Sequence, residues 1–266
     1  MIREPLNERS VIVHEDRRSL ATGVADRFFD LLAEVLATKP TAQLVLTGGT
    51  VGAEVLAAIA ASPRLHSLDW NRVEFWWGDE RWLPSGDPER NDTLADEALL
   101  TVLVEDGTLD PARIHRAPAS DGSLGLDAAA RHYADELAQH AAEGASVPDF
   151  DLVFLGVGPD GHVASLFPDR EGIRVTEATV IAVRESPKPP PERLSLTLPA
   201  INGADRVWLC LAGADKAAAL GLALAGASTV DVPAAGVAGR LRTVFFIDSA
   251  ATADVSPDLL AEGESV

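Results

Sequence analysis

Short apolar runs rich in β-branched residues alternate with longer, Ala-rich stretches of helical period along most of this chain. This alternation constrains the fold more than any other feature, because repeated strand–helix units assemble a mainly parallel sheet with helices on its faces. The sequence therefore predicts an α/β fold with a mainly parallel open sheet. The runs that we expect to form strands are 11–14, 43–46, 72–77, 151–155, 179–183, 194–198, 206–211 and 243–247.

Residue spacing predicts two of the helices between these strands. Residues that recur at three- and four-residue intervals mark one buried helical face, namely Leu126, Ala129, Ala130, Tyr133, Leu137 and His140. His132 and His140 are most simply structural or exposed helix residues. The stretch VGAEVLAAIAA, residues 51–61, predicts a second helix that ends at the following Ser-Pro pair.

The loops give no sign of a domain boundary. Segments 85–92 and 185–193 are rich in Pro, Gly and charge, which is typical of surface loops, and neither resembles a linker. A chain of 266 residues suits one large α/β domain or two small ones. Without a linker we expect a single domain over 1–266, ending in a short acidic tail, 261–266, that frays.

The single cysteine and the distribution of apolar residues predict a reducing cellular compartment. Cys210 is the only cysteine, so neither an internal disulfide nor a paired-cysteine metal or redox site can form, which favours a reducing compartment. The first 18 residues carry charges throughout and lack the apolar core of a signal peptide. No stretch approaches the ~20 apolar residues that span a bilayer. We expect a cytoplasmic protein with no membrane partner.

The charge balance argues against a nucleic-acid partner. Lys and Arg number 22 against 41 Asp and Glu, a formal net charge of −19, which repels nucleic acid unless a basic patch overrides it. No such cluster is visible in the sequence. An anionic ligand must then be held by a few isolated cations and by backbone N–H groups, so basic residues near glycine turns are of interest.

The first candidate segment is QLVLTGGTVGAEVL, where an expected strand runs through Gly48 and Gly49 into a helix. Free backbone N–H groups at the positive end of a helix dipole hold phosphate well. The Thr47 and Thr50 hydroxyls can donate further hydrogen bonds. The alternative is an ordinary strand–helix turn, since neither dinucleotide nor P-loop spacing is present.

The second segment is RVEFWWGDERWLP, in which a strand ends in a charged run at Asp79, Glu80 and Arg81. Ligands of open α/β sheets bind beyond the carboxyl ends of the strands. Arg81 could bind a phosphate or carboxylate, and Asp79 or Glu80 could accept hydroxyl hydrogen bonds or act as acid or base. A solvated cluster of ion pairs is the alternative.

The third segment, LGVGPDGHVASLFP, places His162 and Asp160 just beyond another strand. An unperturbed histidine titrates near ~6.5 and is the best general base at neutral pH, and a nearby carboxylate can orient it. Gly156, Gly158 and Gly161 match the GxGxxG spacing, but Pro159 and Asp160 between them argue against a dinucleotide-binding site. A lone loop histidine is, by itself, more often structural.

Two later segments supply cations. PKPPPERLSLTLPAIN is a Pro-rich loop leading into a strand, where Lys188 and Arg193 could close over an anion, although loop cations often only solubilise. In LAGADKAAAL, Lys216 falls in the first turn of an expected helix, where a cation opposes the helix dipole at a cost of about 0.3 kcal/mol or more. A bound anion would remove that mismatch. Polar groups at four strand ends together predict a phosphorylated, polyhydroxylated ligand.

These segments in this order resemble the glucosamine-6-phosphate isomerase/6-phosphogluconolactonase family, from about residue 10 to about residue 248. The resemblance implies a Rossmann-like single domain, a monomer or small homo-oligomer, that hydrolyses 6-phospho-D-glucono-1,5-lactone in the pentose phosphate pathway without an obligatory metal or organic cofactor. The chain departs from the family in having Thr47 and Thr50 where Ser is common, and Arg-Asn-Asp around Asn91 where Ser-Asn is common.

The resemblance also implies residue roles. His162 would activate the attacking water, Asp160 would orient the site, and Asp79 would contact sugar hydroxyls. The residues implied for the phosphate are Gly48, Gly49 and Thr50, with the cations Arg81, Arg193 and Lys216.

Three functions remain open from the sequence: the lactonase, an isomerase or deaminase of sugar phosphates on the same fold, and a catalytically silent sugar-phosphate sensor. The sensor would need an output module, and no helix-turn-helix or basic face is evident. Ser165 could suggest a Ser–His nucleophile pair, but no G-x-S-x-G elbow surrounds it. We therefore expect Ser165 to cap or pack near the site.

Overall fold

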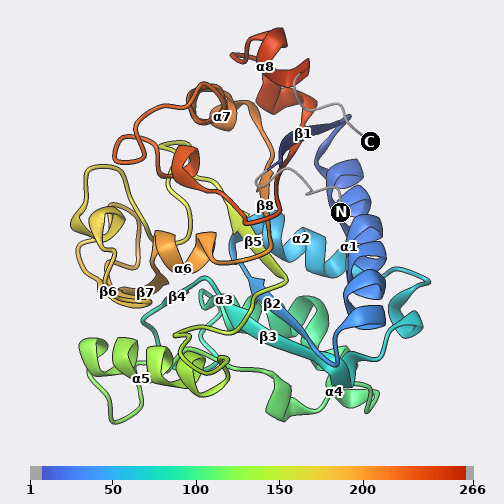
Figure 1. Ribbon diagram of the computed structural model, residues 1–266, viewed down its shortest axis with the longest axis vertical. Helices are drawn as coiled ribbons and strands as arrows, with labels where there is room; N and C mark the ends of the chain where they lie inside the picture. The colour runs from blue at the N-terminus through green and yellow to red at the C-terminus, as the bar shows by residue number, and fades with distance from the viewer. Residues whose placement is uncertain (1–7, 262–266) are drawn as a thin grey trace.

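The computed structural model describes residues 8–261, so that the expected acidic tail lies, except for its first residue, outside the described part. A six-stranded sheet forms the centre of the molecule (Figure 1), with the strand order β1-β9-β8-β5-β2-β3 and every neighbouring pair parallel. This confirms the predicted α/β fold with a mainly parallel sheet. The strands are β1 (Glu8–His14), β2 (Ala42–Leu46), β3 (Val73–Trp77), β5 (Leu152–Gly156), β8 (Arg206–Leu211) and β9 (Arg242–Asp248).

The sheet is buried on both faces because successive side chains of a strand point to opposite sides. Leu44 and Leu46 of β2 pack in one apolar cluster with α1 (Arg17–Thr38) and α2 (Gly49–Ala60). Val45 packs in a second cluster with α5 (Leu126–Gln139) and α7 (Ala217–Leu224). Trp76 and its neighbour Trp77 divide between the clusters in the same way. The longer helices are α1 (Arg17–Thr38), α2 (Gly49–Ala60), α5 (Leu126–Gln139) and α7 (Ala217–Leu224).

Local sequence explains where these helices begin and end. Asp16 caps α1 through a reciprocal pair of hydrogen bonds with Ser19, the capping-box arrangement. The helix predicted near 126–140 is α5, and its five buried residues are those of the predicted apolar face. The helix predicted over 51–61 begins two residues earlier, at Gly49. The short helices are α3 (Asn91–Ala95), α4 (Thr101–Glu105), α6 (Leu198–Asn202) and α8 (Pro257–Ala261), with a π-helical turn, Asp96–Leu100, joining α3 to α4.

A second, three-stranded sheet lies beside the first and is antiparallel, in the order β4-β7-β6. Its strands are β4 (Asp79–Arg81), β7 (Arg193–Leu196) and β6 (Val180–Val183). The strand predicted over 194–198 is wrong at its end, because β7 ends at Leu196 and Leu198, which is followed by Pro199, begins α6. Arg193, expected in a loop, is the first residue of β7.

The connections between strands place a crevice at the centre of the large sheet. From β2 the chain passes through α2 to β3 at one edge, whereas β5, β8 and β9 follow one another toward the other edge. The topology thus reverses between β2 and β5. In open α/β sheets, ligands bind at this reversal, outside the carboxyl ends of the strands.

Candidate active site

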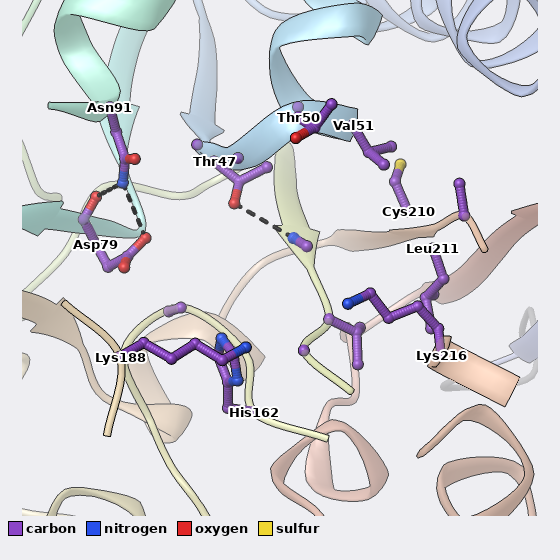
Figure 2. A pocket seen from close by; sticks show the side chains of 18 of the residues that line it. Thr47, Thr50, Val51, Asp79, Asn91, His162, Lys188, Cys210, Leu211 and Lys216 are labelled. Carbon is purple, nitrogen blue, oxygen red and sulfur yellow. Dashed lines mark hydrogen bonds between the residues drawn. The ribbon is translucent and has the colours of Figure 1, made fainter. Parts of the chain in front are cut away.

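A cavity of 370 Å³ opens at this position (Figure 2). Its walls come from the carboxyl ends of β2, β5 and β8, from the small sheet, and from the first helix. The site residues predicted from the sequence line it, except Asp160, which contacts the ring of His162, and Glu80, an alternative candidate. The polar and glycine residues of the lining are Arg17, Thr47, Gly48, Gly49, Thr50, Gly52, Asp79, Arg81, Asn91, Gly156, Gly158, His162, Lys188, Arg193, Asp215 and Lys216.

The β2–α2 turn presents backbone donors to the cavity. Gly48 is the N-cap of α2 and receives no side-chain cap, and Gly49 has a φ of 79°, in the left-handed region that favours glycine. The first N–H groups of α2 are therefore available to an anion. The Thr47 hydroxyl accepts a hydrogen bond from the Gly156 N–H at 3.3 Å, drawn in Figure 2, and so ties this turn to the end of β5.

His162 and Asp160 form a close pair on the opposite wall. Nδ1 of His162 lies 2.5 Å from Oδ1 of Asp160, and the Lys188 ammonium lies 4.0 Å from the same oxygen. Partial burial works against the charged carboxylate, but the hydrogen bond and charge of His162, with Lys188, lower the pKa of Asp160 to about 2. A carboxylate that accepts from Nδ1–H leaves a lone pair on Nε2, the form that a base needs.

Asp79 is held by three side chains, so the alternative of a solvated cluster of ion pairs does not describe it. It is 8% exposed, and its Oδ2 accepts from the Ser165 hydroxyl at 2.6 Å and lies 3.9 Å from the Arg193 guanidinium. Asn91 donates to the other oxygen at 3.2 Å. The contact of Ser165 with Asp79 agrees with the expectation that Ser165 packs near the site.

The alternative role suggested for Glu80 is wrong. Glu80 is 1% exposed and does not line the cavity, because β4 pairs with β7 and turns this side chain inward. Its carboxyl accepts the backbone N–H groups of Arg81, Asn91 and Asp92. Burial raises the pKa of Glu80 to about 7, against the opposing charge of Arg90. It is a structural group.

The cations of the cavity are engaged to different degrees. Arg193 donates to the carbonyls of Lys188, Pro189 and Pro190 and so fixes the Pro-rich loop. Arg81 donates to the Glu89 carbonyl, and its buried Nε has no hydrogen-bond partner in the described part of the chain.

Lys216 closes a 3-10 turn, Ala214–Lys216, and is the N-cap of α7, one position before the predicted place in its first turn. Asp215, 2.9 Å from its ammonium, offsets the unfavourable helix dipole. Figure 2 shows Lys216 across the cavity from Asp79.

A family model described as glucosamine-6-phosphate isomerases/6-phosphogluconolactonase matches residues 15–245. A Streptomyces coelicolor protein named 6-phosphogluconolactonase is 51% identical over 253 residues, covering 94% of this chain and 95% of that protein. Its namesake from Mycobacterium tuberculosis is 40% identical over 246 residues, covering 92% and 97%. The chain belongs to this family.

Solved structures agree with the assignment. The 6-phosphogluconolactonase of Thermotoga maritima is 27% identical and superposes with a TM-score of 0.76 over 91% of this chain and all of that one. A monomeric glucosamine-6-phosphate deaminase reaches 0.75 at 21% identity, over 92% and 99%, which shows the shared fold alone. The Rossmann-like architecture expected of the family is confirmed.

Within this family fold, the sequence left two cavity residues without a role. Arg17 lies at the start of α1, far in sequence from the glycine turns, and belongs to no recognisable motif. It forms a loose ion pair with Glu54 at 3.8 Å. Asn91 stands out in the sequence only as part of a departure from a family motif, and its contact with Asp79 is visible only in the tertiary structure.

Between residues 8 and 261, no group of three or more His, Cys, Asp or Glu side chains is arranged to hold a metal ion. Over the same range, no helix combines the length and the apolar character that crossing a membrane requires.

Proposed function

We propose that this chain hydrolyses 6-phospho-D-glucono-1,5-lactone to 6-phosphogluconate. The observation that carries the proposal is the His162–Asp160 pair facing the same cavity as the uncapped β2–α2 turn. A general base and a phosphate cradle in one cavity are what a phosphorylated ester substrate requires. The names of the relatives at 51% and 40% identity support the same activity.

The phosphate would lie against Gly48, Gly49 and Thr50, with Lys216 nearby. Arg81 and Arg193 would add positive charge from the small sheet. Arg193 would act mainly through its charge, because most of its N–H groups already donate to loop carbonyls. Asp79, whose orientation is fixed by its neighbours, would accept hydrogen bonds from sugar hydroxyls.

The proposed reaction needs one base and no covalent nucleophile, since a lactone is already an activated ester. Nε2 of His162 takes a proton from water as the water oxygen bonds to the lactone carbonyl carbon. The ring C–O bond then breaks, and the ring oxygen takes the proton back from His162 to become the free hydroxyl. Lys188, which lies beside His162 in Figure 2 and 4.0 Å from the Asp160 carboxylate, would favour the negative charge that develops on the carbonyl oxygen.

The test is a direct comparison of two substrates. Lactone opening should be measured as the enzymatic increment in 6-phosphogluconate over the spontaneous background at neutral pH. Ammonia release from glucosamine 6-phosphate should be measured with the same preparation. We expect a large increment with the lactone and no ammonia, whereas ammonia release without lactone hydrolysis would replace the proposal by a deaminase.

A further inference from the structure

Asn91, the first residue of α3, lies between the two halves of the cavity. Its Nδ2 donates to the Asp79 carbonyl at 2.8 Å and to the Asp79 carboxylate at 3.2 Å, as Figure 2 shows. Its Oδ1 faces Gly48. A Cβ placed on Gly48 would lie only 1.7 Å from that oxygen, and the three atoms nearest to it all belong to the Asn91 amide. One side chain therefore contacts both Asp79 and the β2–α2 turn.

Asn91 is held so firmly that its amide cannot simply swing aside. The residue is 1% exposed. The Glu80 carboxyl accepts its backbone N–H at 2.7 Å and that of Asp92 at 2.9 Å. Arg90, also 1% exposed, pairs with the Asp92 carboxylate at 2.7 Å. Rotating the amide would break both bonds to Asp79 without offering new partners.

We propose that Asn91 is a positioning residue for the reaction proposed above. It orients the Asp79 carboxylate and sets the spacing between that carboxylate and the phosphate turn. The inference rests on the proposed function in assigning a sugar to the Asp79 side of the cavity. It also explains Gly48 in a new way: with φ −90° and ψ −159°, this position suits any residue, and glycine is needed there because Asn91 occupies the space of a Cβ.

A double-mutant cycle separates this explanation from the simpler one that phosphate needs a glycine. Gly48→Ala should lower kcat/KM about 100-fold, and Asn91→Ala about 10- to 100-fold. In the Asn91→Ala background, adding Gly48→Ala should lower kcat/KM by less than about a further threefold. Equal losses from Gly48→Ala in both backgrounds would overturn the proposal. If Gly48→Ala alone does not fold, recovery of a cooperative melt in the double variant carries the same conclusion.

The isosteric change Asn91→Asp tests the orientation of Asp79. It keeps the shape against Gly48 but replaces the donor by an oxygen that repels the Asp79 carboxylate. By calorimetry, 6-phosphogluconate should lose at least about tenfold more affinity than inorganic phosphate, because phosphate is weakened only by the new charge beside the turn, whereas 6-phosphogluconate also loses the oriented Asp79 carboxylate. Equal weakening of both ligands, or of neither, would refute the positioning role.

Gly125→Ala is the matched control. Gly125 is also a glycine N-cap, of α5, but a Cβ there meets no atom within 4 Å and the residue lies outside the cavity. This variant should keep its kinetic constants. The binding measurements also distinguish failure of the proposed function from failure of this inference. A wild type without lactonase activity would contradict the proposed function. The comparison of 6-phosphogluconate with inorganic phosphate would still decide the role of Asn91.

Discussion

At the scale of single residues, two contacts hold the side chain of His162, the proposed base, at the wall of the cavity. The histidine ring packs on Phe167, with ring centroids 4.6 Å apart, and its Nδ1 is committed to the carboxylate. Packing on one side and a charged hydrogen bond on the other fix the ring orientation. The remaining nitrogen is therefore directed by two independent contacts, which is the preorganisation that a general base needs.

Replacing His162 by Ala should lower kcat for lactone hydrolysis about 100-fold or more, because general-base catalysis of this kind contributes 10²- to 10⁴-fold. Binding of 6-phosphogluconate, measured by calorimetry, should change little, since the phosphate and hydroxyl contacts remain. His132→Ala, on the exposed side of α5, is the matched control and should be fully active. Full activity of the His162 variant would remove the base from the mechanism.

Asp160→Asn should lower kcat at least about tenfold with little change in KM, because an amide can donate to Nδ1 and so favour the wrong tautomer. The pH dependence offers a second measurement. With a pKa of about 2, the Asp160 carboxylate keeps its charge down to about pH 3. Protonation of Asp160 therefore contributes nothing to a loss of activity between pH 4 and 7. If the wild type loses activity in that range, Asp160→Asn should lose activity over the same range.

At the scale of elements, the β2–α2 turn depends on its two glycines for different reasons. Gly49 needs a positive φ, whereas a Cβ there would meet no atom within 4 Å. Gly49→Ala should therefore cost only backbone strain, about 1–2 kcal/mol in the free energy of unfolding. Urea unfolding measures that cost, and the Kd for inorganic phosphate should weaken as the turn distorts. An unchanged unfolding free energy would contradict the conformation described for this turn.

His115 contacts carboxylates of both β3 and α5, and this contact should make the stability of the fold depend on pH. Nε2 of His115 lies 2.9 Å from Glu74 of β3, and Nδ1 lies 3.0 Å from Glu136 of α5. Burial opposes protonation, but these two carboxylates raise the pKa of His115 above its ordinary value. A raised histidine pKa stabilises the fold fully below the unfolded value, and this stabilisation disappears as pH rises through the folded value.

The contribution of this contact to the unfolding free energy should therefore fall between pH 6 and pH 9. Urea unfolding at the two pH values measures the change. His115→Gln, which cannot take up a proton, should be less stable at pH 6 and should lose this part of the pH dependence. An equal slope in the wild type and the variant would assign the pH dependence to other groups.

Sequence patterns predicted the large sheet well because its strands are continuous apolar runs buried on both faces. They did not predict β4, since Asp79, Glu80 and Arg81 are polar and are buried only through their pairing with β7 and through partners such as Asn91. The glycine turn and His162 followed from local motifs. Arg17 and the Asn91 contact did not, because chain segments far apart in sequence create them.

At the scale of the whole molecule, the large sheet joins the two ends of the described chain. β1 pairs only with β9 in the sheet order, and β9 contributes Phe245, Phe246 and Ile247 to the two cores. A chain that stops at Arg240 should therefore fail to fold, giving no cooperative thermal transition by circular dichroism. A chain that stops at Ser256 loses only α8 among the described elements and should still melt cooperatively. Cooperative melting of both would show that β9 is dispensable.

The same pairing bears on how the protein is made. Register joins Glu8 to Arg242 and His14 to Asp248, so β1, the first strand of the described chain, pairs with β9, the last one. Until β9 has been synthesised, β1 lacks its partner in the sheet, and the apolar side chain of Val11 lacks part of its core. Completion of this edge therefore waits for the synthesis of β9. Slower translation should not hasten it, whereas chaperones that shield early apolar segments should raise the yield of active enzyme.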